Sequence, residues 1–192
     1  MSARHTRTRL VTTGLLAVVV AAGVGANLLD ENYTATGQQL VAMELGADVE
    51  VAPFRVHIHD AWAATTLLDR DEEPIQTTGV WVFVEMSYAS IAEYEIPDHL
   101  LLRDSHGRVY EQSRRAPHAL WPGHPDLWHR GVVAIEVPED ALGEVRVEFL
   151  PASMHALAPL RYGSIDLVID PDEIETEPVM MERAELLPGG ER

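Results

Sequence analysis

The chain has 192 residues and carries 31 acidic against 14 basic side chains, so its formal net charge is −17. Hydrophobic residues make up 46% of the sequence, enough to build a core, while the acidic balance disfavours nucleic-acid binding, because contacts to phosphates dominate that affinity. The sequence has no Cys and no Lys, which excludes disulfides, thiolate metal sites, Cys nucleophiles and lysine Schiff bases.

The N-terminal residues predict export. Residues 1–9 contain three Arg and no acid, and residues 10–29 are twenty uncharged, mostly apolar residues that end before Asp30. About 20 apolar residues can cross a bilayer as a helix, and Arg on the leading side predicts a cytoplasmic basic tail at 1–9 followed by a transmembrane helix at 10–29. The alternative is a cleaved signal peptide, because residues 24–26 form an acceptable small-residue cleavage site. Both interpretations place the rest of the chain outside the cytoplasm.

Residues 30–48 lack a clear pattern and are predicted to be a linker. From residue 49 the apolar residues follow the two-residue period of strands, and no long amphipathic helix separates them. The turn at 104–107 between two of these strands predicts a hairpin. Seven strands are expected at residues 49–58, 80–87, 99–103, 108–112, 131–137, 144–150 and 165–169.

Short strands separated by turn residues predict an all-β antiparallel sandwich or barrel over residues 49–170. Residues 171–192 contain seven acids and are expected to be an acidic flexible tail. The alternation predicts that the core includes Val56, Ile58, Val82, Val84, Leu101, Val133, Ile135, Val145, Val147, Phe149 and Leu167.

Three segments in this order resemble the DUF4352-type immunoglobulin-like domains of exported and membrane-anchored proteins, including actinobacterial ones. Residues 79–88 resemble the central strand of that family, and residues 101–110 resemble its L-x-D-x-x-G-x-x-Y hairpin. Pro122-Gly123 followed by residues 131–138 resembles its P-G…G-x-V-x-F-x-V-P segment, although Ile135 stands where an aromatic residue is typical. The resemblance implies an extracytoplasmic immunoglobulin-like sandwich and implies no reaction.

His57 and His59 alternate on one predicted strand, so their side chains share a face. Such a pair could bind Zn or Cu if a third ligand such as Asp60 joined it. The competing interpretation, which we favour, is the polar solvent face of a strand, because two ligands do not make a closed site.

The connection at 116–130 is the most unusual part of the sequence, with three His and two Trp close together. This His-rich loop, residues 118–129, could serve a cell-envelope carrier of copper or zinc, with His155 or Met154 as a further ligand. Alternatively, the Trp side chains could close one end of the sandwich. The third interpretation is a contact surface for a partner, since Trp and Arg are enriched at interface hot spots. Its residues are His118, Trp121, His124, Trp128, His129 and Arg130.

No catalytic motif is visible: the sequence has neither a G-x-S-x-G elbow nor an H-E-x-x-H pair. A fold by itself does not indicate a reaction. We therefore expect a non-enzymatic binding or accessory module without a cofactor, anchored at the cell membrane and contacting another membrane or envelope protein. The metal carrier remains the alternative.

Overall fold

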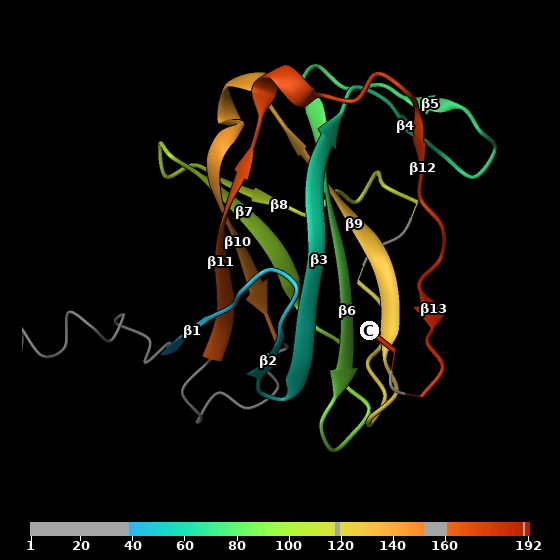
Figure 1. Cartoon of the computed structure of the whole chain (residues 1–192). Coiled ribbons are helices and arrows are strands. Elements are labelled where there is room, and N and C mark those ends of the chain that lie inside the picture. The colour runs from blue at the N-terminus through green and yellow to red at the C-terminus, as the bar shows by residue number, and fades with distance from the viewer. Residues whose placement is uncertain (1–38, 118–119, 152–160, 190) are drawn as a thin grey trace, which may run out of the picture. The chain divides into compact units, whose positions relative to one another are not determined.

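The computed structural model describes residues 39–117, 120–151, 161–189 and 191–192 (Figure 1). Within these ranges the secondary structure consists of β-strands and two short 3₁₀ turns, η1 (Glu139–Ala141) and η2 (Pro171–Glu173). None of the described residues forms a helix of the length and hydrophobicity needed to cross a membrane. The predicted basic tail at 1–9 and the apolar segment at 10–29 lie outside the described residues.

The strands form two five-stranded sheets and one small sheet. The first sheet has the order β1 (Gln39–Ala42), β11 (Arg161–Ile169), β10 (Gly143–Leu150), β7 (His99–Asp104), β8 (Val109–Glu111). The second has the order β13 (Glu185–Leu186), β9 (His129–Val137), β6 (Val80–Ser90), β3 (Phe54–Ala64), β2 (Asp48–Val51). The small sheet has the order β12 (Val179–Met180), β4 (Leu67–Leu68), β5 (Pro74–Ile75).

The two large sheets pack face to face and enclose the main core, so the predicted all-β sandwich is confirmed (Figure 1). Nine of the eleven predicted core residues are buried: Val56, Ile58, Val82, Val84, Val133, Ile135, Val145, Val147 and Phe149. Leu167 is half-buried and packs against that core. Alternation along each strand therefore places one face of each sheet inside.

The prediction for Leu101 is wrong, because its neighbours Leu100 and Leu102 are the fully buried residues of β7. Three consecutive Leu residues carry no alternation, so the sequence does not reveal which of them faces the core.

β6 is buried on both of its faces. Val82 and Val84 point into the main core, whereas Trp81 and Phe83 point to the other side of the sheet and form a second apolar cluster. This explains the near-continuous apolar run of the strand, which is typical of strands covered on both faces. The outer face of the second sheet is therefore covered, and the residues that cover it come from distant parts of the sequence.

The predicted flexible tail at 171–192 has a different structure. β12 pairs with β4 and β13 pairs with β9, and Met181 enters the second apolar cluster. The apolar residues of this segment outweigh its acidic composition because they pack on Trp81 and Phe83, on the outer side of the second sheet. The predicted linker at 30–48 also contributes, since β1 joins the first sheet and the Met43 amide donates to Ser164 at 2.8 Å.

Candidate functional site

One end of the sandwich is built from two connections, residues 91–98 after β6 and residues 120–128 before β9. Their backbones are joined by hydrogen bonds: Gly123 N donates to Glu95 O at 2.7 Å, and Glu95 N donates back to Gly123 O at 3.1 Å. Ser90 N donates to His124 O at 3.2 Å, and Asp126 N donates to Ser90 O at 3.1 Å. Side chains on these connections are therefore held on a fixed frame.

Trp121 is part of the wall of the core. Its ring stacks on Tyr88 with the centroids 4.7 Å apart and the planes 9° from parallel. The Trp121 amide donates to the Tyr88 hydroxyl at 2.8 Å, and that hydroxyl donates to the Trp121 carbonyl. Burial raises the pKa of Tyr88 well above its ordinary value, with the hydrogen bond to Trp121 opposing it. The indole of Trp121 closes the end of the sandwich.

Trp128 is also buried, with 5% of its surface exposed. The Arg192 guanidinium lies over the Trp128 ring, 4.2 Å from the centroid. The Trp128 carbonyl accepts a 2.8 Å hydrogen bond from Leu187 N. Trp121 is half-buried against the core, which favours the alternative interpretation of an indole that closes the sandwich. Trp128 is covered by the C-terminal residues of its own chain, so its surface is not open to a partner in this structure.

Three other apolar side chains stand exposed at this end. Tyr94 is 56% exposed, Leu127 48% and Ile96 47%. The Tyr94 ring lies 5.2 Å from the ring of His124, and the backbone at His124 bridges to Leu127. We name Tyr94, Ile96, His124 and Leu127 the loop-end patch. Exposed acids flank it, namely Glu93, Asp98 and Asp126.

Sequence reasoning missed Tyr94, Ile96 and Leu127. A usable signal was present, since Tyr94 and Ile96 alternate with acids directly after a buried strand and before Pro97. Alternating apolar residues in a connection, rather than in a strand, have no sheet to pack against.

His57 and His59 share the outer face of the second sheet, as predicted, with ring centroids 4.4 Å apart. His57 Nδ1 lies 2.8 Å from Asp48 Oδ1, and His59 Nε2 lies 2.7 Å from Ser87 Oγ. The β3–β6 ladder shifts register between Ile58 and Asp60, which leaves His59 without a partner residue there. Each imidazole thus already has a hydrogen-bond partner in the protein.

The surroundings of His59 keep it neutral. Burial lowers its pKa to about 4, the charges of Arg130 and His57 act in the same direction, and Glu85 and Asp48 oppose them. Arg130 itself donates to Glu85 Oε1 at 2.9 Å, so its guanidinium is already paired on this face.

The other predicted metal ligands are only partly brought together. The His124 and His129 rings have centroids 5.6 Å apart, while His118 lies outside the described residues. No group of three or more His, Asp or Glu able to hold a metal occurs among the described residues. Burial lowers the pKa of His129, although a backbone hydrogen bond at Leu127 partly offsets this.

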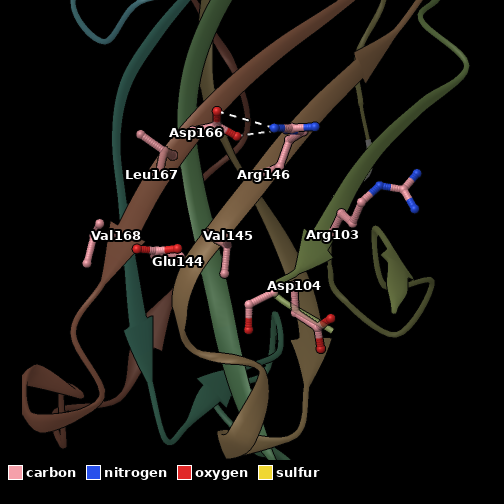
Figure 2. Close-up of a pocket in the computed structure, with 9 residues that line it drawn as sticks. Arg103, Asp104, Glu144, Val145, Arg146, Asp166, Leu167 and Val168 are labelled. Carbon is pink, nitrogen blue, oxygen red and sulfur yellow. Dashed lines mark hydrogen bonds and ion pairs between the residues drawn. The ribbon is translucent and has the colours of Figure 1, made fainter. Parts of the chain in front are cut away.

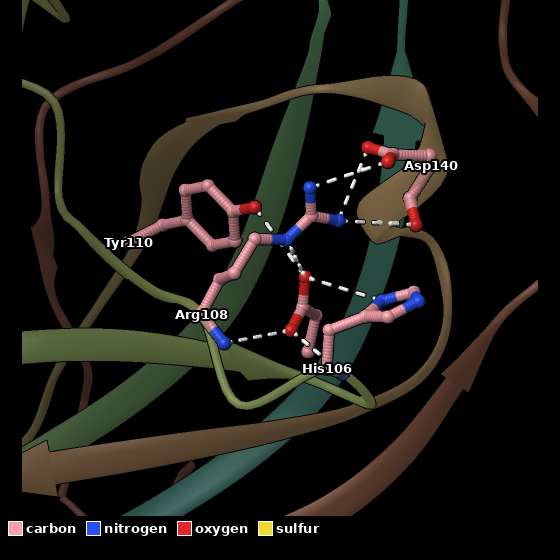
Figure 3. Close-up of polar contacts among 5 residues, drawn as sticks. His106, Arg108, Tyr110 and Asp140 are labelled. Carbon is pink, nitrogen blue, oxygen red and sulfur yellow. Dashed lines mark hydrogen bonds and ion pairs between the residues drawn. The ribbon is translucent and has the colours of Figure 1, made fainter.

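The hairpin motif at 102–110 is organised around Asp104, whose side chain is fully enclosed. Figure 3 shows the Arg108 guanidinium of this turn directed toward Asp140. The Asp104 carboxylate accepts bonds from His106 N at 2.9 Å, Arg108 N at 2.8 Å and Arg108 Nε at 2.5 Å. Tyr110 Oη lies 3.4 Å away, and Gly107 takes the left-handed backbone that the turn requires, with φ +80°. Burial raises the pKa of Asp104, but the bonds from Arg108 outweigh it, and the pKa lies below its ordinary value. The motif therefore builds a turn.

A shallow hollow of about 510 Å³ lies on the outer face of the first sheet (Figure 2). Arg146 and Asp166 cross it as an ion pair at 2.7 Å, and Arg103 is paired with Glu148 at 3.1 Å. Val168 is 75% exposed at its border. Both Arg side chains that line the hollow are paired with carboxylates, so among its lining residues it offers no unpaired cation to an anionic ligand.

No protein-family model matches the sequence, and no curated protein matches it. Two solved structures are similar to the chain. The yjhA protein from Bacillus subtilis has 10% identity and a TM-score of 0.49, with 65% of this chain and 98% of that chain covered. An uncharacterised β-sandwich protein from Clostridium difficile 630 has 9% identity and a TM-score of 0.45, with coverage of 68% and 95%.

Proposed function

We propose that the protein is a non-catalytic binding module, held outside the cytoplasm by its N-terminal segment, that contacts another membrane or envelope protein through the loop-end patch. The exposure of Tyr94, Ile96 and Leu127 on one rigid end of the sandwich carries this proposal. Tyr offers a large contact area at low entropic cost and is enriched at interface hot spots.

The strand order supports an immunoglobulin-like type for the sandwich. β3-β6-β9 in one sheet and β8-β7-β10-β11 in the other correspond to the orders A-B-E and C′-C-F-G of that fold. The resemblance to DUF4352-type domains adds to this inference, because Asp104, Gly107 and Tyr110 all act in the hairpin turn.

The proposed location rests on the sequence of the first 30 residues. Basic residues followed by twenty uncharged residues favour a membrane anchor with its C-terminal side outside. A tethered domain is confined near the bilayer, which raises its effective concentration toward other membrane proteins.

The patch also indicates the chemistry of the partner. Its apolar centre is flanked by Glu93 and Asp98 in a chain of net charge −17, whereas the third acid, Asp126, is already paired with Arg55 at 3.0 Å. Charge complementarity favours a partner whose apolar contact is bordered by Lys or Arg, because matched potentials guide encounter and suppress wrong partners.

A paired substitution tests the function. Y94A/L127A removes two exposed side chains and should leave thermal unfolding close to wild type, because neither side chain is part of the core. The matched control is V168A, which removes an even more exposed apolar side chain on the first sheet. We expect one membrane or envelope protein to co-purify with wild type and V168A and to be lost with Y94A/L127A. Equal recovery with all three would refute the patch as the contact.

A further inference from the structure

The guanidinium of Arg192 is held by two side chains that lie far from it in the sequence. Its carbon atom, Cζ, lies over the face of the Trp128 indole, 4.2 Å from the ring centroid. Its Nε donates a hydrogen bond to Asp48 Oδ2 at 2.6 Å. An aromatic face attracts a cation through the ring quadrupole, and a carboxylate adds a charge-assisted hydrogen bond. Trp128 and Asp48 together therefore bind a guanidinium, and we name this pair the guanidinium site.

Both walls of the guanidinium site belong to strands of the second sheet. Asp48 opens β2, and its second carboxylate oxygen, Oδ1, lies 2.8 Å from His57 Nδ1 on the neighbouring strand β3. Burial raises the pKa of Asp48, but the hydrogen bonds from Arg192 and His57 outweigh it, so the pKa lies below its ordinary value. Trp128 directly precedes β9. The sheet thus holds a charged carboxylate and an indole face in position.

Arg192 is a weakly held occupant of the site. In its ion pair with Asp48, the Arg192 side chain is 35% exposed and the Asp48 side chain 40% exposed. The Nη1 of Arg192 donates to the carbonyl of the adjacent Glu191 at 3.3 Å, a bond within its own segment. Pro188, Gly189 and Glu191, which precede it, are exposed. Because an exposed ion pair contributes little to stability, a second guanidinium can replace Arg192 at small cost.

The geometry of the site selects Arg over Lys. A planar guanidinium can lie with its face on an indole while an N–H at its edge donates to a carboxylate, as Arg192 does here. The ammonium of Lys is a compact, strongly hydrated point charge that gains less from the ring. The net charge of −17 adds a general attraction for cationic segments. The ligand that fits the site is therefore an Arg side chain.

The guanidinium site adjoins the loop-end patch, because Trp128 directly follows Leu127 and the His129 ring lies 5.6 Å from the His124 ring of the patch. From these features we propose that the guanidinium site receives an Arg side chain of the partner, and that Arg192 occupies the site until the partner displaces it. This inference rests on the proposed function and adds two points to it. The partner presents an Arg beside its apolar contact, and Arg192 competes with that contact.

A small arginine derivative tests the site in the full chain, kept in detergent, without knowledge of the partner. N-acetylarginine amide is titrated into wild type and R192A, and NMR follows the indole N–H resonance of Trp128. We expect a saturable shift in R192A, because its site is free and both walls remain. The response of wild type should be weaker at the same concentrations, since the tethered Arg192 competes at a high effective concentration. N-acetylcitrulline amide, which has a similar shape but no charge, should give no saturable shift.

Further variants in the R192A background make the outcome decisive. R192A/D48N should lose most of the response to arginine, whereas R192A/E50Q, changed at an exposed acid of the same strand, should keep it. R192A/Y94A/L127A should also keep it, so failure of the loop-end patch and failure of the guanidinium site can be told apart.

Three results would overturn the inference. They are a folded R192A chain without a saturable shift, an equal response to citrulline or in R192A/D48N, and an R192A chain that does not fold, because Arg192 would then be structural.

Discussion

The imidazole Nε2 of His59 lies 2.7 Å from the Oγ of Ser87, a residue with no exposed surface. Burial holds the pKa of His59 at about 4, below the ordinary value of 6.5. The folded protein therefore binds a proton at this site less readily than the unfolded chain.

This relationship predicts the pH dependence of stability. The neutral form of His59 contributes its full stability above pH 6.5, and that contribution is lost as pH falls from 6.5 toward 4. His59→Gln removes the titrating group, so its melting temperature should fall less over this range than that of wild type. His106→Gln, an exposed hairpin residue, is the control and should follow wild type. Parallel curves for all three proteins would contradict the assignment.

Trp128→Ala should destabilise the protein. The indole is 5% exposed and is covered by Arg192, so its removal creates a cavity worth about 3 kcal/mol or more of unfolding free energy. Denaturant unfolding measures the loss. Leu127→Ala, the exposed neighbour, should change unfolding by less than about 0.5 kcal/mol. A Trp128 variant as stable as wild type would restore Trp128 as a candidate contact residue.

Asp104→Asn should lower the melting temperature at neutral pH. The side-chain amide of Asn is neutral and has a single acceptor oxygen, so it cannot replace both the charged bond from the Arg108 side chain and the bonds from the backbone amides. Asp166→Asn breaks an ion pair on the exposed sheet face and should have a much smaller effect. Thermal unfolding of both variants decides the point. If the two losses are equal, Asp104 does not organise the turn.

Gly131→Ala should loosen the C-terminal strap, the name we give to residues 179–189 and 191–192. An added Cβ would lie 2.8 Å from Cζ3 of Trp121 and 3.1 Å from the Cβ of Ala184, so either the ring or the strap must move. Trypsin cleavage after the exposed Arg183 should become faster than in wild type. Gly189→Ala, where a Cβ meets nothing within 4 Å, is the control and should leave the rate unchanged.

The carrier hypothesis has its own measurement. Protein purified without added metal should contain no stoichiometric copper or zinc in elemental analysis, because a closed site needs more ligands than a His pair supplies. About one metal ion per chain, lost in His124→Ala or His129→Ala, would replace the binding module with the carrier as the leading function.

The sequence predicts the sheets well where apolar and polar residues alternate. Val56, Ile58, Val145 and Val147 are buried because a two-residue period with one polar face has a single favourable orientation. The orientation of Leu101 could not be predicted in this way, since its neighbours are equally apolar. Strand lengths could not be predicted either, because β3 continues to Ala64 across a bulge that the sequence does not reveal.

The strap and the direction of the two indoles could not be predicted from local pattern. The segment 171–192 reads as acidic and disordered because its partner surface, Trp81 and Phe83, exists only after the sandwich has formed. Trp128 lies in a connection whose composition is equally typical of a contact surface. Its burial depends on Arg192, 64 residues later in the chain.

The attachment of the strap predicts the order in which parts of the protein would separate under a mechanical load. β13 is joined to β9 by two residue pairs, whereas β10 is joined to β11 by seven. A pull applied at Arg192 therefore separates the weak, short pairing before the long ladders of the sandwich are stressed. We therefore expect the strap to detach first, which lengthens the chain while the sandwich stays folded.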